Sequence, residues 1–109
     1  MNDDDAVSQL SALAQATRFG VFRLLMRQGK KGMAAGDIAK ELAVPQNTLS
    51  AHLTILFNAN LINSKRHGRS MIYSVDLDRT RDLMSYLVND CCDGHPEICS
   101  ISADSTACA

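Results

Sequence analysis

The chain has 109 residues, of which 46% are hydrophobic and 21% charged, and its formal net charge at pH 7 is −1. This is the composition of one small globular domain, and it excludes a fibrous or low-complexity chain. No apolar run approaches the length of a membrane span, and the acidic start MNDDDAV is unlike a signal peptide. We therefore expect a cytoplasmic protein that does not contact a membrane.

The small net charge conceals an uneven distribution along the chain. Residues 18–69 carry nine Lys and Arg against Asp37 and Glu41, a balance of +7. The remaining residues carry two Arg against ten carboxylates, a balance of −8. A basic middle between acidic ends suggests a surface for a polyanion, although charge by itself slightly favours ordinary solvated helix surface.

Two helices are predicted first. Residues 4–15 place three apolar side chains on one helical stripe behind an acidic start. Thr17 is the expected N-cap of a second helix, which Gly29 is expected to end. The stripe of the first helix comprises Val7, Leu10 and Leu13, and the core face of the second comprises Val21, Phe22, Leu25 and Met26.

Two shorter helices are predicted next, over residues 37–42 and 46–59, joined by a tight turn at 43–45. In the longer of them, apolar side chains recur at i, i+4 and i+7 and are expected to face inward. Asn60 stands where this helix has to end, because asparagine tolerates the left-handed conformation that a C-cap needs. The inward-facing residues are Leu49, Leu53 and Leu56.

A β-hairpin and a last helix complete the predicted elements. The segments INSKR and SMIYSV flank a His67-Gly68 turn, and alternation on both sides of that turn predicts the hairpin. The last helix, DRTRDLMSYLVNDCC, is more apolar along one side than the surface helix of so small a domain needs. The first and last helices are therefore the candidate homodimer interface. The apolar side of the last helix comprises Leu83, Met84, Leu87, Val88 and Cys91.

Two consecutive short helices followed by a basic-tipped hairpin predict a mainly α fold with a β-hairpin, the winged helix-turn-helix. In this fold the second helix enters the major groove of double-stranded DNA and the wing contacts the backbone. Gln and Asn bond base edges, Ser and Thr bond bases or phosphates, and Lys and Arg attract phosphates. The predicted DNA-contacting residues are Gln46, Asn47, Thr48, Ser50, Ala51, His52, Thr54, Lys65, Arg66 and Arg69, with Lys40 and Arg18 as further sources of phosphate attraction.

The two histidines of this region have alternative interpretations. His52 either contacts DNA or packs half-buried against the preceding helix, and His67 is interpreted as a wing-tip residue rather than a ligand. Neither has a Ser, Cys or carboxylate partner at a recognisable catalytic spacing, and the chain has no CxxC pair. We therefore expect no enzymatic activity.

The segments LAQATRFGVFRLL, DIAKELAVPQNTLSAHLTIL, NANLI and RHGRSMIYSV together resemble the ArsR/SmtB family of winged-helix, metal-responsive repressors. The resemblance runs from about Leu10 to Leu87. It implies a homodimer joined by its first and last helices, binding to an inverted-repeat operator and ligand-induced release of DNA. It also implies that five helix residues face the groove and that two arginines lie on the wing. These are Gln46, Asn47, Ser50, Ala51 and His52, with Arg66 and Arg69.

The sensing sites common in that family are missing from this sequence. Its third helix, GDIAKELAV, has no Cys-x-Cys pair, and its last helix has no histidine before the cysteines. The four cysteines instead fall within the last 19 residues: Cys91, Cys92, Cys99 and Cys108. Clusters of this kind in a reducing cytosol are more often metal-binding or redox-active than disulfide-bonded. The arrangement CCDGHPEIC is similar to that of arsenite sensors in the family.

The number of cysteine ligands favours a metalloid at the segment CCDGHPEIC. Gly94 and Pro96 interrupt the helix, so the chain is able to turn and bring Cys99 towards the adjacent pair. Trivalent arsenic or antimony is soft and prefers three thiolates, which Cys91, Cys92 and Cys99 supply. Zinc or cadmium needs four ligands, and His95 would complete a Cys₃His set. A methylated arsenical would need only two thiols.

The sequence thus predicts an arsenic(III)-responsive repressor that releases its operator when As(III) or Sb(III) binds. The alternative is a repressor of the same fold that responds to Cd or Zn, or to thiol oxidation. Residues 1–90 are expected to form the DNA-binding and dimerisation domain, and 91–109 a cysteine segment with a flexible tail in which Cys108 is spare.

Overall fold

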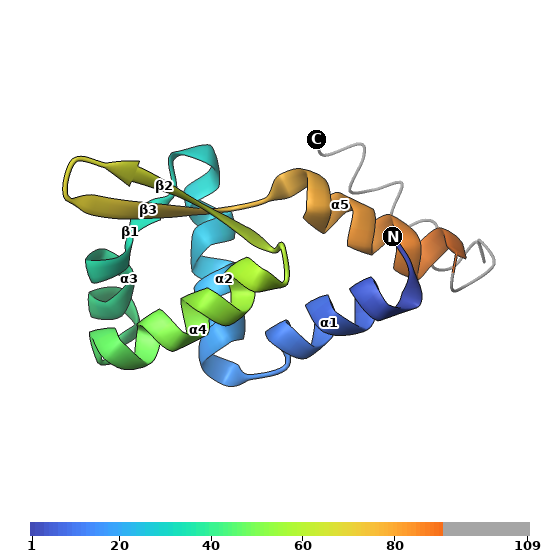
Figure 1. Cartoon of the computed structure of the whole chain (residues 1–109), viewed down its shortest axis with the longest axis horizontal. Helices are drawn as coiled ribbons and strands as arrows, with labels where there is room; N and C mark the ends of the chain where they lie inside the picture. The colour runs from blue at the N-terminus through green and yellow to red at the C-terminus, as the bar shows by residue number, and fades with distance from the viewer. Residues whose placement is uncertain (91–109) are drawn as a thin grey trace.

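The computed structural model describes residues 1–90 (Figure 1). The predicted cysteine segment at 91–109, with Cys91, Cys92 and Cys99, lies outside the described residues. In chain order the elements are α1 (Asp3–Leu13), α2 (Ala16–Gln28), the 3₁₀ turn η1 (Gly29–Lys31), β1 (Met33–Ala34), α3 (Ala35–Leu42), α4 (Gln46–Asn58), β2 (Ile62–His67), β3 (Ser70–Val75), α5 (Leu77–Ser85) and the π-helical turn η2 (Tyr86–Asp90). This order confirms the predicted winged helix-turn-helix.

The core forms where α2, α3 and α4 meet one face of the sheet. Leu49, Leu53 and Leu56 of α4 are all buried, which confirms the inward stripe predicted for that helix. They belong to one apolar cluster with buried residues of α2 and α3 and with Ile62 and Val75 of the two long strands. Because burial of these leucines fixes the rotation of α4, its opposite side is left towards solvent.

The ends of the helices follow the predicted residues at two positions and depart from them at a third. Gly29 caps the end of α2 with φ of +66°, and Asn60 follows α4 with φ of +63°, as predicted. Thr17 is not the N-cap of α2, because Ala16 is already helical. The extended residue Gln15 caps the helix instead, and its side-chain oxygen accepts a hydrogen bond from the Arg18 N–H at 2.9 Å.

The buried side of α2 also differs in part from its predicted core face. Val21 and Leu25 are buried as predicted and Phe22 is partly buried, but Met26 is exposed and Leu24 is buried. Five residues correspond to about 140° around a helix, so Met26 cannot share a narrow stripe with Val21. Leu24 and Leu25, three and four residues after Val21, lie much nearer to it around the helix, and these two are buried in the core instead.

The sheet has three antiparallel strands in the order β1-β3-β2. His67 pairs with Ser70, so the turn consists of Gly68 and Arg69, one residue later than predicted. Gly68 has φ of +63°, the positive value that a two-residue hairpin turn needs at its first position. Strand β1 was not predicted. It is only two residues long, and it forms because Met33 pairs with Tyr73 of β3.

The two faces of the sheet have different surroundings. Ile62 and Val75 lie on the inner face, against the core that contains α4. Alternation along β2 puts Arg66 on this same inner face and Lys65 on the outer face. Neighbouring wing cations therefore point to opposite sides of the sheet.

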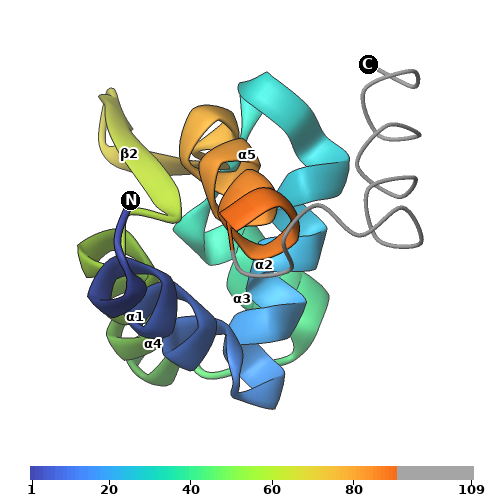
Figure 2. The ribbon, with the colours of Figure 1, turned by 90° about the vertical axis from the view of Figure 1, so that its right-hand side faces the viewer.

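Helices α1 and α5 stand beside this body (Figures 1 and 2). The only buried residue of α5 is Leu83, and Met84 of the apolar stripe that was predicted as a dimer interface is exposed. The predicted continuous helix through Cys92 is wrong in part, because the α-helix ends at Ser85 and a wider π-helical turn follows to Asp90. The Tyr86 hydroxyl donates a hydrogen bond to Asp3 and so joins η2 to the start of α1. None of the helices within residues 1–90 is both long and apolar enough to span a membrane.

We predict that Gly32→Ala destabilises the fold by about 3 kcal/mol or more. Gly32 has φ of +66°, and a Cβ atom there would lie 2.3 Å from the Tyr73 carbonyl oxygen of β3. Gly29→Ala is the matched control, since Gly29 has the same φ but no atom within 4 Å of an added Cβ. We expect Gly29→Ala to cost about 1–2 kcal/mol in urea unfolding. If the two variants lose the same free energy of unfolding, the close contact between Gly32 and β3 does not contribute to the cost of Gly32→Ala.

Candidate nucleic-acid interface

The outward side of α4 is polar and open. Of its predicted DNA-contacting residues, all except His52 are exposed. Pro45 precedes the helix without a side-chain cap, which leaves backbone N–H groups of the first turn for an incoming phosphate. The exposed residues are Gln46, Asn47, Thr48, Ser50, Ala51 and Thr54. Their contact with DNA stays a prediction.

Hydrogen bonds within α4 determine which groups on this side are free to donate. The Ser50 hydroxyl donates to the Gln46 carbonyl at 3.0 Å, and the Thr54 hydroxyl donates to the Ser50 carbonyl at 2.9 Å. Both hydroxyl oxygens therefore face solvent mainly as acceptors. The Asn47 Oδ1 accepts from the Thr48 N–H at 2.9 Å, which leaves the Asn47 amide N–H groups free to donate to a base edge.

His52 is half-buried and belongs to the link between α4 and α2. Its Nδ1 lies 3.4 Å from the Nη1 of Arg18, whose Nε donates to the Ala12 carbonyl at 2.6 Å. The structure thus agrees with the packing interpretation of His52, but the partner is on α2 rather than on the preceding helix. Arg18 is itself half-buried, and two of its guanidinium nitrogens are engaged by Ala12 and His52.

A second polar contact joins α1 to α4. The Gln9 side chain is buried, and its Nε2 donates to the Ala59 carbonyl at the C-terminal end of α4 at 3.2 Å. Sequence patterns did not identify Gln9, because it is polar and only the apolar residues of its helix, which were assigned to the candidate dimer interface, gave a signal. Together with the contacts of Arg18 to Ala12 and His52, this hydrogen bond links α1 to α4.

The wing supplies cations for which residues 1–90 provide no carboxylate partner. Lys65, Arg66 and Arg69 are all exposed. Within residues 1–90 the one ion pair joins Arg81 to Asp78, at 2.9 Å. Arg66 lies on the face of the sheet that meets α4, whereas Lys65 lies on the outer face. The wing is therefore able to offer Arg66, and Arg69 at its turn, to a duplex that α4 engages.

Metal ligands do not gather in the part of the chain that the structure describes. No group of three His, Cys, Asp or Glu side chains lies close enough there to hold a metal ion. The three predicted thiolate ligands are outside that part.

Known proteins are similar to this chain in sequence and in fold. A family model described as a helix-turn-helix domain matches residues 13–65. The transcriptional repressor SdpR of Bacillus subtilis strain 168 is 33% identical over 79 residues, which cover 72% of this chain and 83% of SdpR. A homodimeric winged helix-turn-helix DNA-binding domain from Mycobacterium bovis is 28% identical, with a TM-score of 0.65 over 89% of this chain and 92% of that domain. An ArsR-like transcriptional regulator from Rhodococcus sp. RHA1 shares the fold with a TM-score of 0.73 over 92% of both chains, at 21% identity.

We predict that Arg66→Gln weakens DNA binding and makes it less dependent on salt. Loss of one phosphate contact lowers the slope of log K against log salt concentration by about 0.9 for each protomer that binds. Fluorescence anisotropy at several salt concentrations measures this slope. Arg79→Gln, which removes an exposed arginine from α5, is the control and leaves the slope unchanged. If both variants have the wild-type slope, Arg66 does not contact a phosphate.

Proposed function

The chain belongs to the ArsR/SmtB family of winged-helix transcriptional regulators, and on that premise we propose that it represses transcription as a homodimer. In this proposal the dimer releases its operator when trivalent arsenic or antimony binds Cys91, Cys92 and Cys99. The observation that carries this proposal is the position of the cysteine pair. Cys91 follows directly after η2, at the end of the helix that leaves most of its apolar side chains uncovered.

Repression follows from the open polar side of α4 together with the wing. In a two-fold dimer, two copies of α4 enter successive major grooves about one helical turn apart and read an inverted repeat. Base contacts are able to use both hydrogen-bond donors and acceptors on this side of α4. The side-chain amides of Gln46 and Asn47 provide donors, and the hydroxyls of Ser50 and Thr54 provide acceptors. SdpR, the relative described above, is a repressor.

Dimerisation through α1 and α5 is supported by the large apolar side chains that these helices expose. Val7 is 63% exposed and Leu10 42% on α1, and Met84 is 58% exposed on α5. In a two-fold dimer the same patch of each protomer lies in the interface, so both copies of each of these side chains are buried. The related Mycobacterium bovis domain is homodimeric.

The chemistry of three thiolates favours a trivalent metalloid as the effector. As(III) and Sb(III) bind three soft ligands in a pyramid, and Cys91, Cys92 and Cys99 provide three with none left over. Cd(II) or Zn(II) requires a fourth ligand, for which His95 is the nearest candidate in the sequence. Oxidation of the same thiols is the remaining alternative.

Hydrogen bonds connect the turn that precedes the cysteines to α1, and α1 to α4, so binding at the thiolates is able to affect DNA binding. The π-helical turn at Tyr86–Asp90 separates α5 from the cysteines, and such turns often occur at functional sites. Tyr86 is bonded to Asp3 of α1, and α1 is bonded to α4 through Gln9. Metalloid binding that reshapes the end of α5 thereby shifts α1 and the recognition helix. A coupling of about 1–3 kcal/mol weakens operator binding roughly 5- to 150-fold.

We predict that Cys92→Ser and Cys99→Ser bind the operator as tightly as wild type but no longer release it when arsenite is added under reducing conditions. Cys108→Ser is the matched control and releases DNA normally, because this thiol is not one of the three ligands. Fluorescence anisotropy with As(III), Sb(III), Cd(II) and Zn(II) measures the release.

The response of the variants separates the effectors. Release by As(III) and Sb(III) that is unchanged in His95→Ala supports the metalloid, whereas release by Cd(II) or Zn(II) that is lost in His95→Ala supports a Cys₃His site. Release by an oxidant in the absence of any metal supports the redox alternative. Arsenite-driven release from Cys99→Ser would contradict the three-thiolate site.

We also predict that Met84→Glu and Leu10→Glu prevent dimerisation, since each would bring two carboxylates into an apolar two-fold interface. Their dimer dissociation constants are expected to rise about tenfold or more, with a matching loss of affinity for the inverted repeat. Met26→Glu, on α2, is the control, because Met26 is exposed to 43%, about as much as Leu10. Sedimentation equilibrium measures the assembly. Wild-type dimerisation of both α1 and α5 variants would place the interface elsewhere.

A further inference from the structure

The exposed hydroxyl side chains of α4 are of two kinds, which differ in what they are able to donate. The Ser50 hydroxyl donates to the Gln46 carbonyl at 3.0 Å, and the Thr54 hydroxyl donates to the Ser50 carbonyl at 2.9 Å. The Thr48 hydroxyl is exposed too, but residues 1–90 provide no hydrogen-bond partner for it. Ser50 and Thr54 therefore use their only hydroxyl hydrogen inside the helix, whereas Thr48 keeps its hydrogen for a ligand.

A hydroxyl whose hydrogen is already donated recognises donors rather than acceptors. The Ser50 and Thr54 oxygens keep lone pairs for an incoming group, and the internal bonds polarise these oxygens, which strengthens them as acceptors. A phosphate oxygen is itself an acceptor, so a bond from either hydroxyl to a phosphate would first have to break the bond within α4. These two side chains are thus poorly suited to the DNA backbone and well suited to N–H groups.

The N–H groups that the major groove offers are the amino groups at adenine N6 and cytosine N4, whereas guanine and thymine present carbonyl acceptors there. Ser50 and Thr54 are four residues apart, so they lie on the same side of α4 and about 6 Å apart along its axis. This separation is close to two base-pair steps of about 3.4 Å each. One row of acceptors on α4 therefore matches two amino groups about two base pairs apart.

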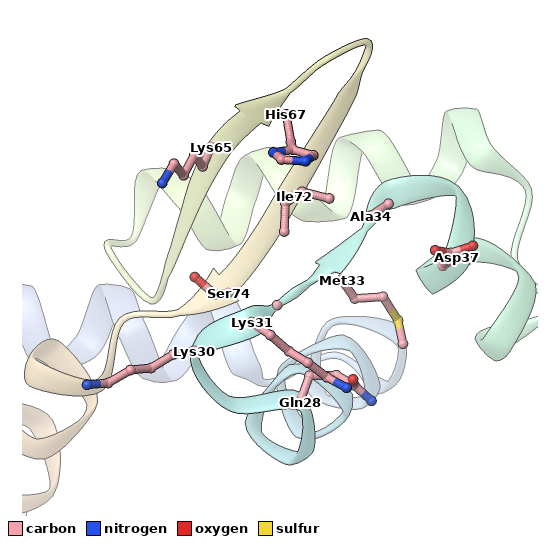
Figure 3. Close-up of a pocket in the computed structure, with 11 residues that line it drawn as sticks. Gln28, Lys30, Lys31, Met33, Ala34, Asp37, Lys65, His67, Ile72 and Ser74 are labelled. Atoms are coloured by element: carbon pink, nitrogen blue, oxygen red, sulfur yellow. The ribbon is translucent and has the colours of Figure 1, made fainter.

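The outer face of the wing does not share in this reading. Figure 3 shows Lys65, His67 and Ile72 on that face of the hairpin, which is turned away from α4. Their side chains therefore do not point towards a groove that α4 enters. Arg66, on the inner face, is predicted to attract a phosphate. Discrimination between bases with an amino group and bases with a carbonyl group thus depends on α4 itself.

We propose that Ser50 and Thr54 are specificity-determining residues, whose hydroxyl oxygens accept hydrogen bonds from adenine N6 or cytosine N4, and that Thr48 donates to a backbone phosphate. This inference rests on the proposed function in one respect, since it requires that α4 enters the major groove of an operator. It does not depend on which effector releases the DNA.

The test selects binding sequences from a random pool of duplex DNA with the full-length wild-type protein and its variants. We expect the wild-type consensus to prefer A or C over G or T on one strand by about fivefold at two positions of each half-site. Ser50→Ala should abolish the preference at one position and Thr54→Val at the other. Thr54→Ser retains the hydroxyl and should retain the preference. Because both side chains are exposed, these substitutions leave the core intact.

Thr48→Val is the matched control, because it removes a hydroxyl that is expected to contact a phosphate. It should weaken binding to the selected sequence and to unrelated duplex DNA by the same factor, about threefold, without changing the consensus.

The outcomes that would overturn the inference are distinct from a failure of the proposed function. An unchanged consensus for both Ser50→Ala and Thr54→Val would overturn it, and so would a loss of affinity that is equal on every sequence, which marks a phosphate contact. A wild-type preference for G or T at the affected positions would mean that these hydroxyls donate. Each of these results leaves the proposed function standing, whereas a wild-type protein that selects no consensus contradicts both.

Discussion

The burial of Leu49, Leu53 and Leu56 is the constraint on which the rest of this protein depends. These side chains pack into the cluster formed by α2, α3 and the inner face of the sheet, and this packing sets the rotation of α4. Once that rotation is set, the polar residues of α4 face solvent in a fixed pattern. Hydrogen bonds within the helix then leave Asn47 with free donors and Ser50 with a free acceptor. A core of ordinary leucines thus sets the polar surface that is predicted to contact DNA.

The same core leaves α1 and α5 incompletely covered, and polar contacts connect them to the reading helix. Gln9 reaches the end of α4 at Ala59, Arg18 bridges the end of α1 and His52, and Tyr86 bonds Asp3. Directional bonds of this kind hold two helices at a defined angle without requiring a large apolar boundary. They support the proposed effector response, because hydrogen bonds are able to transmit a change at the end of α5 to α1 and from α1 to α4.

The strand alternation of the wing divides its cations between the two faces of the sheet. Arg66 lies on the side of α4, where it is predicted to attract a DNA phosphate, and Lys65 lies on the outer side. The sheet that separates them is joined to η1 and β1 by the close packing of Gly32. One short hairpin therefore presents basic side chains on both of its faces.

The sequence by itself determined the winged helix-turn-helix and the exposed residues of α4, because helical periodicity, strand alternation and the turn residues Gly29 and Asn60 are local signals. It also predicted the cysteine site, which lies outside the described residues. The tertiary structure decided the features that depend on distant partners. Strand β1 forms only because β3 accepts it, and the π-helical turn after Ser85 has no local signal. His52 meets a residue 34 positions away and Gln9 one 50 positions away. Periodicity reports which side of an element is apolar, but only the assembled chain decides what covers it.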